Sequence, residues 1–112
     1  MMTAQQVEEI ALSLPGAGKG QHFDVTDFRV GNKIFCTLPK PGRMGIRLAP
    51  DEQAALLAED PGTFSPASGA WGAKGWTQVV LDTADPGQLR ELITDAWRRL
   101  APKKLLQQLD EA

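Results

Sequence analysis

The sequence has very few of the residues that most often carry redox or metal chemistry. Its 112 residues include one cysteine, Cys36, and one histidine, His22. A single cysteine excludes an internal disulfide, and one thiol with one imidazole is too few for the usual tetrahedral zinc sites. A reducing compartment fits this count. The sequence therefore predicts neither a metal site nor any other cofactor.

A long hydrophobic run is also missing. The apolar stretches are much shorter than the roughly 20 residues that cross a bilayer. The start, MMTAQQVEEI, has neither the basic residues nor the apolar stretch of a secretory signal. We therefore expect a cytoplasmic protein with no membrane segment. With 42% hydrophobic and 23% charged residues, the composition predicts a single domain over residues 1–112. We expect a monomer or a weak homodimer.

The chain has no overall excess of positive charge. It contains 12 Lys and Arg against 14 Asp and Glu, which gives a net charge of −2 with the histidine neutral. Such a balance argues against binding to polyanions over the whole surface. Any binding of nucleic acid must therefore depend on a local cluster of basic side chains.

Helical spacing of apolar residues predicts three helices, over residues 4–14, 50–59 and 86–100. Thr3 and Gln6 have the spacing of a capping box at the start of the first helix. Pro50 suits the first turn of the second helix, and Asp85 suits the cap of the third. Pro102 ends or kinks the third helix, and the leucines that follow predict one or two further turns.

Strand patterns fall between these helices, over residues 28–30, 34–38, 43–48 and 76–81, with a further short strand near Trp71. The glycine-rich segment 16–20 is predicted to be a loop. The order is helix, three strands, helix, one or two strands, helix. Tight turns between the first strands favour antiparallel pairing. We therefore expect an α+β fold in which helices pack on an antiparallel sheet as a two-layer sandwich.

The hairpin turn at Gly31-Asn32 leaves two registers open. A two-residue turn places Phe28, Val30 and Phe35 on one face of the sheet. A three-residue turn instead aligns Phe28, Val30, Ile34, Cys36 and Leu38. The residues do not decide between these registers.

Catalytic motifs are weak throughout the sequence. The segment 16–20 resembles a phosphate loop but lacks its first glycine and its final Ser or Thr. His22 lies near Asp24 and could pair with it as a base and an orienting carboxylate, but no nucleophile accompanies them. Cys36 alternates with apolar neighbours and is expected to be a buried thiol. We therefore expect no enzymatic activity and assign no catalytic residue.

Basic residues gather in one segment that contains no acid. Residues 28–50 include Arg29, Lys33, Lys40, Arg43 and Arg47. The ordinary interpretation is that such cations are solvated and discourage the pairing of strand edges. The other interpretation is a phosphate-binding surface, because that needs clustered cations more than overall basicity.

Strand 43–48 shows the clearest alternation. Met44, Ile46 and Leu48 share one face, so Arg43 and Arg47 project from the other, about 13 Å apart. Gly45 lies between the two arginines and is expected to leave a gap in the side chains there. Further along the chain, Lys74 lies between Trp71 and Trp76, which can offer aromatic surface beside a cation.

Several short stretches together resemble the MmcQ/YjbR family of small bacterial proteins. They are Leu14-Pro15-Gly16, Phe28-Arg29-Val30-Gly31-Asn32-Lys33-Ile34-Phe35, Asp60-Pro61-Gly62-Thr63-Phe64, Lys74-Gly75-Trp76 and the helix start Asp85-Pro86. The resemblance implies a CyaY-like fold with a double-wing arrangement of hairpins and a DNA-binding role, and it supplies no catalytic residue. One departure follows the Phe64 stretch, where the family commonly has an aromatic residue and this chain has small residues at 65–70.

These observations predict a nucleic-acid-binding module with DNA as its partner. The residues expected to contact it are Arg29, Lys33, Lys40, Arg43, Arg47, Lys74 and Trp76. The family motifs supply Arg29, Lys33, Lys74 and Trp76, and the charge map supplies the others. The alternative is a protein-interaction module that binds a protein partner through its sheet, without nucleic acid or catalysis.

Overall fold

The structure, a computed structural model, describes residues 1–111. Its strands are β1 (Gly18–His22), β2 (Val25–Val30), β3 (Lys33–Lys40), β4 (Arg43–Arg47), β5 (Phe64–Pro66) and β6 (Trp76–Val80). Its helices are α1 (Ala4–Ser13), α2 (Pro50–Glu59), α3 (Ala70–Ala73), α4 (Pro86–Leu100) and α5 (Lys103–Glu111). The strands form one antiparallel sheet in the order β1-β2-β3-β4-β6-β5, so the predicted α+β class is confirmed.

The first and longest helices begin where their caps predict. Thr3 and Gln6 form the reciprocal capping box, with Gln6 N donating to Thr3 Oγ1 at 3.1 Å and Thr3 N donating to Gln6 Oε1 at 2.8 Å. Asp85 caps α4 by accepting from the backbone of Gln88 at 2.8 Å. Within residues 1–111, no helix combines the length and apolar character needed to span a membrane.

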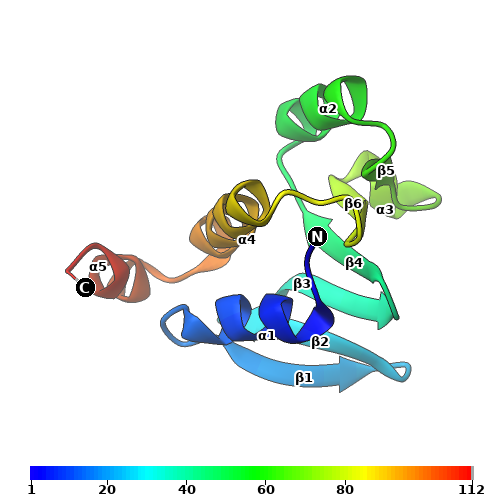
Figure 1. The fold of residues 1–112 in the computed structure, drawn as a ribbon. Coiled ribbons are helices and arrows are strands. Elements are labelled where there is room, and N and C mark those ends of the chain that lie inside the picture. Colours follow the sequence, from blue (N-terminus) through cyan, green and yellow to red (C-terminus); the bar gives the residue numbers. More distant parts are fainter. Residues whose placement is uncertain (112) are drawn as a thin grey trace.

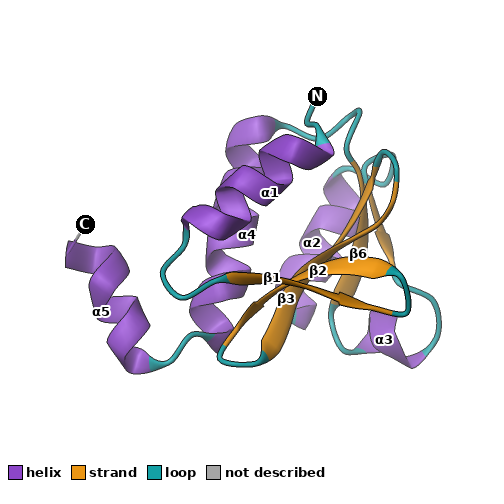
Figure 2. Cartoon of the chain, turned by 90° about the horizontal axis from the view of Figure 1, so that it is seen from below, coloured by secondary structure: helices purple, strands orange, loops and turns teal. Residues whose placement is uncertain are grey.

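Two helices cover one face of the sheet. α1 and α4 lie against each other on that face, as Figures 1 and 2 show from two directions. The apolar stripe of α4 is buried there, with Ile93 and Trp97 completely enclosed. Trp97 also donates from its indole nitrogen to the backbone oxygen of Pro15 at 3.0 Å, which joins α4 to the end of α1. The opposite face of the sheet is left for other contacts.

The hairpin between β2 and β3 combines features of both predicted registers. The turn has two residues, because Val30 pairs with Lys33. The register then shifts, because Arg29 pairs with Ile34 while Phe28 pairs with Cys36, which makes Phe35 the extra residue of a bulge. A bulge lets adjacent side chains share a face. Phe35 and Cys36 are therefore both fully buried in the core.

Two predicted segments have a different structure. Residues 16–20 were predicted to be a loop, but residues 18–20 belong to β1, which pairs along its whole length with β2. Trp71, near which a short strand was expected, lies in α3, and the short strand is β5 at Phe64–Pro66. Local glycines weaken a strand signal, whereas pairing with a neighbouring strand supplies the missing stability.

Candidate functional site

A row of small and polar residues crosses the face of the sheet opposite α1 and α4. Each member pairs with the next across all six strands. In strand order the row is Gly20, Asp27, Thr37, Gly45, Gln78 and Ser65. The equivalent core row contains Phe28, Cys36 and Ile46, so the alternation of the strands separates a buried face from a polar one.

A groove of about 600 Å³ lies on this polar face. Thr37, Gly45 and Gln78 from the row line its floor. The hairpin of β1 and β2 contributes His22 and Phe23 on one side, and the segment around α3 contributes Trp71 and Trp76 on the other. Lys40 and Arg43 line the groove at the hairpin of β3 and β4. The groove therefore combines a low floor, aromatic sides and two cations.

The aromatic side of the groove at α3 is held in place by hydrogen bonds from the buried amide of Gln53 on α2. Gln53 Nε2 lies 3.1 Å from each of three acceptors that share its two hydrogens: the backbone oxygens of Gly72 and Trp76, and Thr77 Oγ1. Thr77 Oγ1 can accept because its own hydrogen goes to the backbone oxygen of Gly75 at 3.0 Å. These bonds fix the segment on which Trp71 is 62% exposed.

Phe23 is presented from an unfavourable backbone conformation. It and Asp24 form the two-residue turn between β1 and β2, with φ values of 46° and 63°. Such turns need positive φ at both positions and usually contain Asn and Gly. Phe23 is nonetheless 96% exposed, with its ring edge-on to that of His22 at 6.1 Å. A bulky residue in this region is uncommon, and such strain gathers at functional sites.

Asp27 holds both His22 and Arg29 on the polar face of the sheet. Its fully buried carboxylate accepts from Arg29 Nε at 2.7 Å and Arg29 Nη2 at 3.0 Å, and it contacts His22 Nδ1 at 2.7 Å. The hydrogen bonds from Arg29 lower the pKa of Asp27. Burial of the carboxyl group acts in the opposite direction, and the smaller contribution of the His22 hydrogen bond again lowers the pKa. The partner of His22 is therefore Asp27, and the pairing with Asp24 considered from the sequence is wrong.

Gly20 makes room for this group. A Cβ at Gly20 would lie 2.8 Å from Asp27 Oδ1 and 3.2 Å from Arg29 Nε. Any side chain there would press on the bidentate contact. The glycine that weakens the strand pattern of β1 thus allows the Asp27 carboxylate to sit over β1.

The predicted contact residues separate into three places. Lys40, Arg43 and Trp76 line the groove, and Lys74 lies with its ammonium 5.4 Å from the ring centre of Trp71. Arg47 lines a separate hollow of about 320 Å³, together with Lys74. Arg29 is occupied by Asp27, and Lys33 is exposed at the opposite end of the hairpin from Lys40. The groove is therefore lined by three of the seven predicted residues, and Lys74 lies beside it against Trp71.

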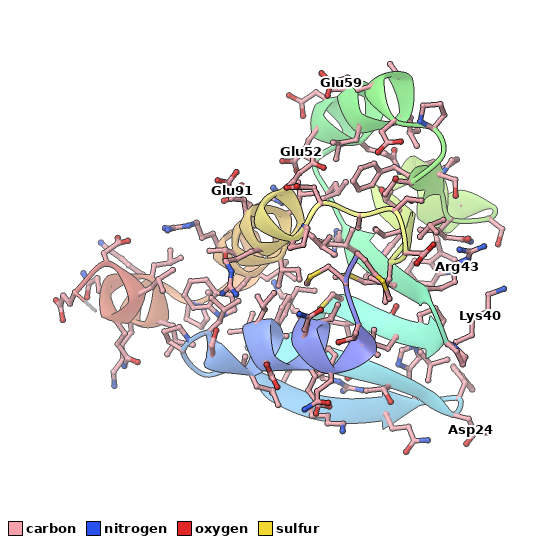
Figure 3. All side chains as sticks on the ribbon, viewed as in Figure 1. Asp24, Lys40, Arg43, Glu52, Glu59 and Glu91 are labelled. Carbon is pink, nitrogen blue, oxygen red and sulfur yellow. The ribbon has the colours of Figure 1, made fainter. Side chains whose placement is uncertain are left out.

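The two arginines of β4 are free of acidic partners within residues 1–111. Glu52 pairs with Arg99 at 3.5 Å, and Arg99 also donates to the backbone oxygen of Arg47 at 3.0 Å. Figure 3 shows Arg43 and Lys40 at the end of the sheet where β3 turns into β4, away from Glu52, Glu59 and Glu91 on the helices. The gap expected over Gly45 is instead filled by the side chain of Thr37.

Sequence reasoning missed Phe23 and correctly assigned Cys36 to the core. The sequence carries no signal that could have found Phe23, because the strand that makes residues 23–24 a turn contains no apolar side chain. Cys36 is fully buried, and burial raises the pKa of its thiol, which leaves it protonated and unreactive.

Comparisons with known proteins identify the fold and a family. A family model described as YjbR matches residues 12–99. Protein DR2400 of Deinococcus radiodurans, a solved structure whose description carries the family-model domain DUF419, aligns with a TM-score of 0.78. The alignment covers 87% of this chain and 77% of that one at 22% identity, which supports a shared fold alone. No curated protein matches the sequence.

Proposed function

The chain belongs to the YjbR family, and from this premise we propose that it binds nucleic acid through the groove on the polar face of its sheet. The observation that carries the proposal is the pair Lys40 and Arg43 on a groove whose lining, within residues 1–111, includes no acid. Phosphate oxygens are the natural partners of such cations. Lys74, beside Trp71, adds a third positive charge next to the groove.

The distribution of charge makes this binding compatible with an acidic protein. Glu52 and Glu59 belong to α2, and Glu91 belongs to α4, while the cations of the groove lie at the end of the sheet where β3 turns into β4 (Figure 3). Asp24, in the turn between β1 and β2, is the one acid that the figure labels at that end. Repulsion from exposed acids falls off within about 8–10 Å at ordinary salt concentrations. A strand that follows the groove therefore meets local positive charge despite the net charge of −2.

The shape of the sheet also favours this function. The turns at Phe23-Asp24 and Pro41-Gly42 lie at the same end of the sheet, each joining two antiparallel strands. Two adjacent hairpins are the elements that the double-wing arrangement of the family resemblance requires. One tip carries the exposed Phe23, and the other lies between Lys40 and Arg43. A nucleic acid at this end can contact both tips.

Fluorescence anisotropy with labelled oligonucleotides tests the proposal. Because Arg29 is occupied, about three cations remain, and the affinity should fall with salt at a log–log slope of roughly −2 to −3. The pair Lys40→Glu and Arg43→Glu should weaken binding at least about tenfold at low salt. The matched control is Lys103→Glu with Lys104→Glu on α5, which changes the net charge equally and should have much less effect.

Two results would contradict the proposal. One is the absence of binding at low salt. The other is an equal loss of affinity in the groove variant and the α5 variant, because that would show attraction to the whole protein and no site.

The second candidate is a protein-interaction module that uses the same face. It is favoured by the exposure of Phe23 and Trp71, since aromatic side chains are frequent anchors in protein interfaces. Affinity purification after nuclease treatment separates the two candidates. A single protein that is recovered by the native chain, retained by the Lys40→Glu and Arg43→Glu variant and lost with Trp71→Ala would support this second function.

A further inference from the structure

The hydrogen bond between His22 and Asp27 fixes which nitrogen of the imidazole carries the proton. Because the pKa of Asp27 is lowered, its carboxylate is ionised at neutral pH and can only accept hydrogen bonds. His22 Nδ1, at 2.7 Å, must therefore be the donor. In the neutral ring the other nitrogen, Nε2, then keeps its lone pair. When its ring is neutral, His22 is thus held by Asp27 with Nε2 as a hydrogen-bond acceptor of defined orientation.

This acceptor belongs to the groove. The Nδ1 edge of His22 rests on the fully buried Asp27, while 35% of the His22 side chain remains exposed and lines the groove. Nε2 lies on the ring edge away from Asp27. A ligand in the groove that covers Nε2 without offering an N–H or O–H group would leave it unsatisfied, which is unfavourable. The groove therefore favours ligands with a donor at this position.

Phe23 and Trp71 define the shape of the ligand. They lie on opposite sides of the groove, and both leave most of their ring surface in water. Flat aromatic rings are recognised by stacking on such surfaces, and stacking of a base on an aromatic side chain is sequence-tolerant. The groove volume of about 600 Å³ falls in the range of roughly 300–1,000 Å³ that encloses small ligands.

Base pairing removes from the ligand both the free donor for His22 and the open ring faces for stacking. In a duplex the faces of the bases are covered by their neighbours, and the ring N–H groups of thymine, uracil and guanine are used in pairs. An unpaired base exposes its faces and its ring N–H together. His22 and the aromatic sides of the groove therefore both select nucleic acid with unpaired bases.

We propose that the groove binds unpaired nucleobases, stacked on Phe23 and Trp71, with a ring N–H donated to Nε2 of His22. This assignment rests on the proposed function, because it names the form of nucleic acid that the same site takes. It also gives Asp27 a positioning role, since Asp27 orients His22 without contacting the ligand.

The test compares three ligands of equal length by anisotropy: a thymidine oligonucleotide, the same oligonucleotide with N3-methylthymidine, and a duplex. The single strand should bind at least about tenfold more tightly than the duplex. Methylation of N3 removes the donor and should weaken binding about fivefold. With His22→Phe, which keeps a ring but no acceptor, the methylated and unmodified strands should bind equally. Trp71→Ala should weaken both, whereas Leu12→Ala, at an exposed apolar residue of α1, should change neither.

The outcomes separate this inference from the proposed function. Equal binding of single strand and duplex, still sensitive to Lys40→Glu with Arg43→Glu, would overturn the inference and leave nucleic-acid binding intact. Absence of any binding would overturn both. Binding of the single strand with no effect of N3 methylation would exclude the contact with His22.

A spectroscopic readout guards against effects of His22→Phe on folding. His22 is the only histidine of the sequence, so its ring signals need no assignment by mutation. Long-range proton–nitrogen correlation spectra of the native protein should show the Nδ1–H tautomer, and Nε2 should shift when thymidine oligonucleotide is added. An Nε2–H tautomer, or an unchanged Nε2 signal at saturation, would overturn the proposed contact.

Discussion

Thr37 Oγ1 lies 2.5 Å from the point that a Cβ on Gly45 would occupy. The two residues are direct partners on β3 and β4, so the threonine side chain leans across the strand that carries the glycine. Gly45 is therefore required by its neighbour and not by its own backbone conformation. The floor of the groove stays free of a second side chain here, because the Thr37 side chain occupies the space above Gly45.

Gly45→Ala should destabilise the protein by about 1–2 kcal/mol, because the added methyl group displaces Thr37 in a packed sheet. Strand propensity alone predicts the opposite sign, with alanine favoured by about 0.5–1 kcal/mol. Urea unfolding measures the difference. The matched control is Gly18→Ala in β1, where no atom lies within 4 Å of the added Cβ and no loss is expected. Combining Gly45→Ala with Thr37→Ala should recover most of the stability, and a failure to do so would exclude this contact as the cause.

The elements that the sequence predicts well are those whose signals are local. The capping box at Thr3 and Gln6, the alternation of Met44, Ile46 and Leu48, and the apolar stripe of α4 each depend on residues within a few positions. Here the pattern and the structure agree because one element alone decides which face is buried. β1 was missed because its five residues, GKGQH, contain no apolar side chain. Its stability comes from pairing with β2, which composition does not reveal.

The site was less predictable than the fold because it depends on contacts across strands. Alternation along β4 correctly placed Arg43 on the polar face, and the resemblance pointed to Lys74 and Trp76. The partnership of His22 with Asp27 depends on the register of β1 and β2, where the nearer carboxylate, Asp24, occupies the turn. Arg29 was expected to contact phosphate, but a sequence cannot show that a neighbour two positions away already occupies it.

Asp27→Asn should change the acid side of the stability profile. The pKa of Asp27 in the folded protein lies below its ordinary value of 3.8, so its contribution is fully present above that pH. It is lost as the pH falls from 3.8 through the lower folded value. The variant should be less stable at neutral pH, by about 1–3 kcal/mol because Arg29 and His22 lose a charged acceptor. This difference should shrink in acid, as measured by urea unfolding at a series of pH values.

The control for that experiment is Asp24→Asn, in the same hairpin. Asp24 is exposed, and asparagine tolerates its positive φ. Its stability should follow that of the native protein at every pH. A constant difference between the native protein and Asp27→Asn down to strongly acidic pH would show that the ionised carboxylate of Asp27 does not stabilise the fold.

Gln53→Met should loosen the segment that carries Trp71. The substitution keeps a long side chain but removes the amide that donates to Gly72, Trp76 and Thr77. The two backbone oxygens each keep another donor, Gly75 N for Gly72 and Ala67 N for Trp76, whereas the buried Thr77 Oγ1 loses its donor. We expect a loss of about 1–3 kcal/mol and faster amide hydrogen exchange at residues 70–77. Gln5→Met on the exposed side of α1 is the control and should change neither quantity. Unchanged exchange at 70–77 would mean that Gln53 does not anchor the groove.

Phe23→Asn should raise stability and lower binding together, which a purely structural residue cannot do. The native turn holds a bulky residue at φ 46°, a left-handed conformation that costs an ordinary residue about 1–2 kcal/mol but suits asparagine. The variant should therefore gain about 0.5–1 kcal/mol, and its melting temperature should rise by a few degrees. It should also lose the stacking surface and bind a thymidine oligonucleotide roughly fivefold or more weakly. Phe23→Tyr keeps both the strain and the ring, so neither the melting temperature nor the affinity should change. A Phe23→Asn variant that is more stable but binds as tightly as the native protein would show that the exposed ring takes no part in binding. A variant that is less stable than the native protein would show that the turn is not strained.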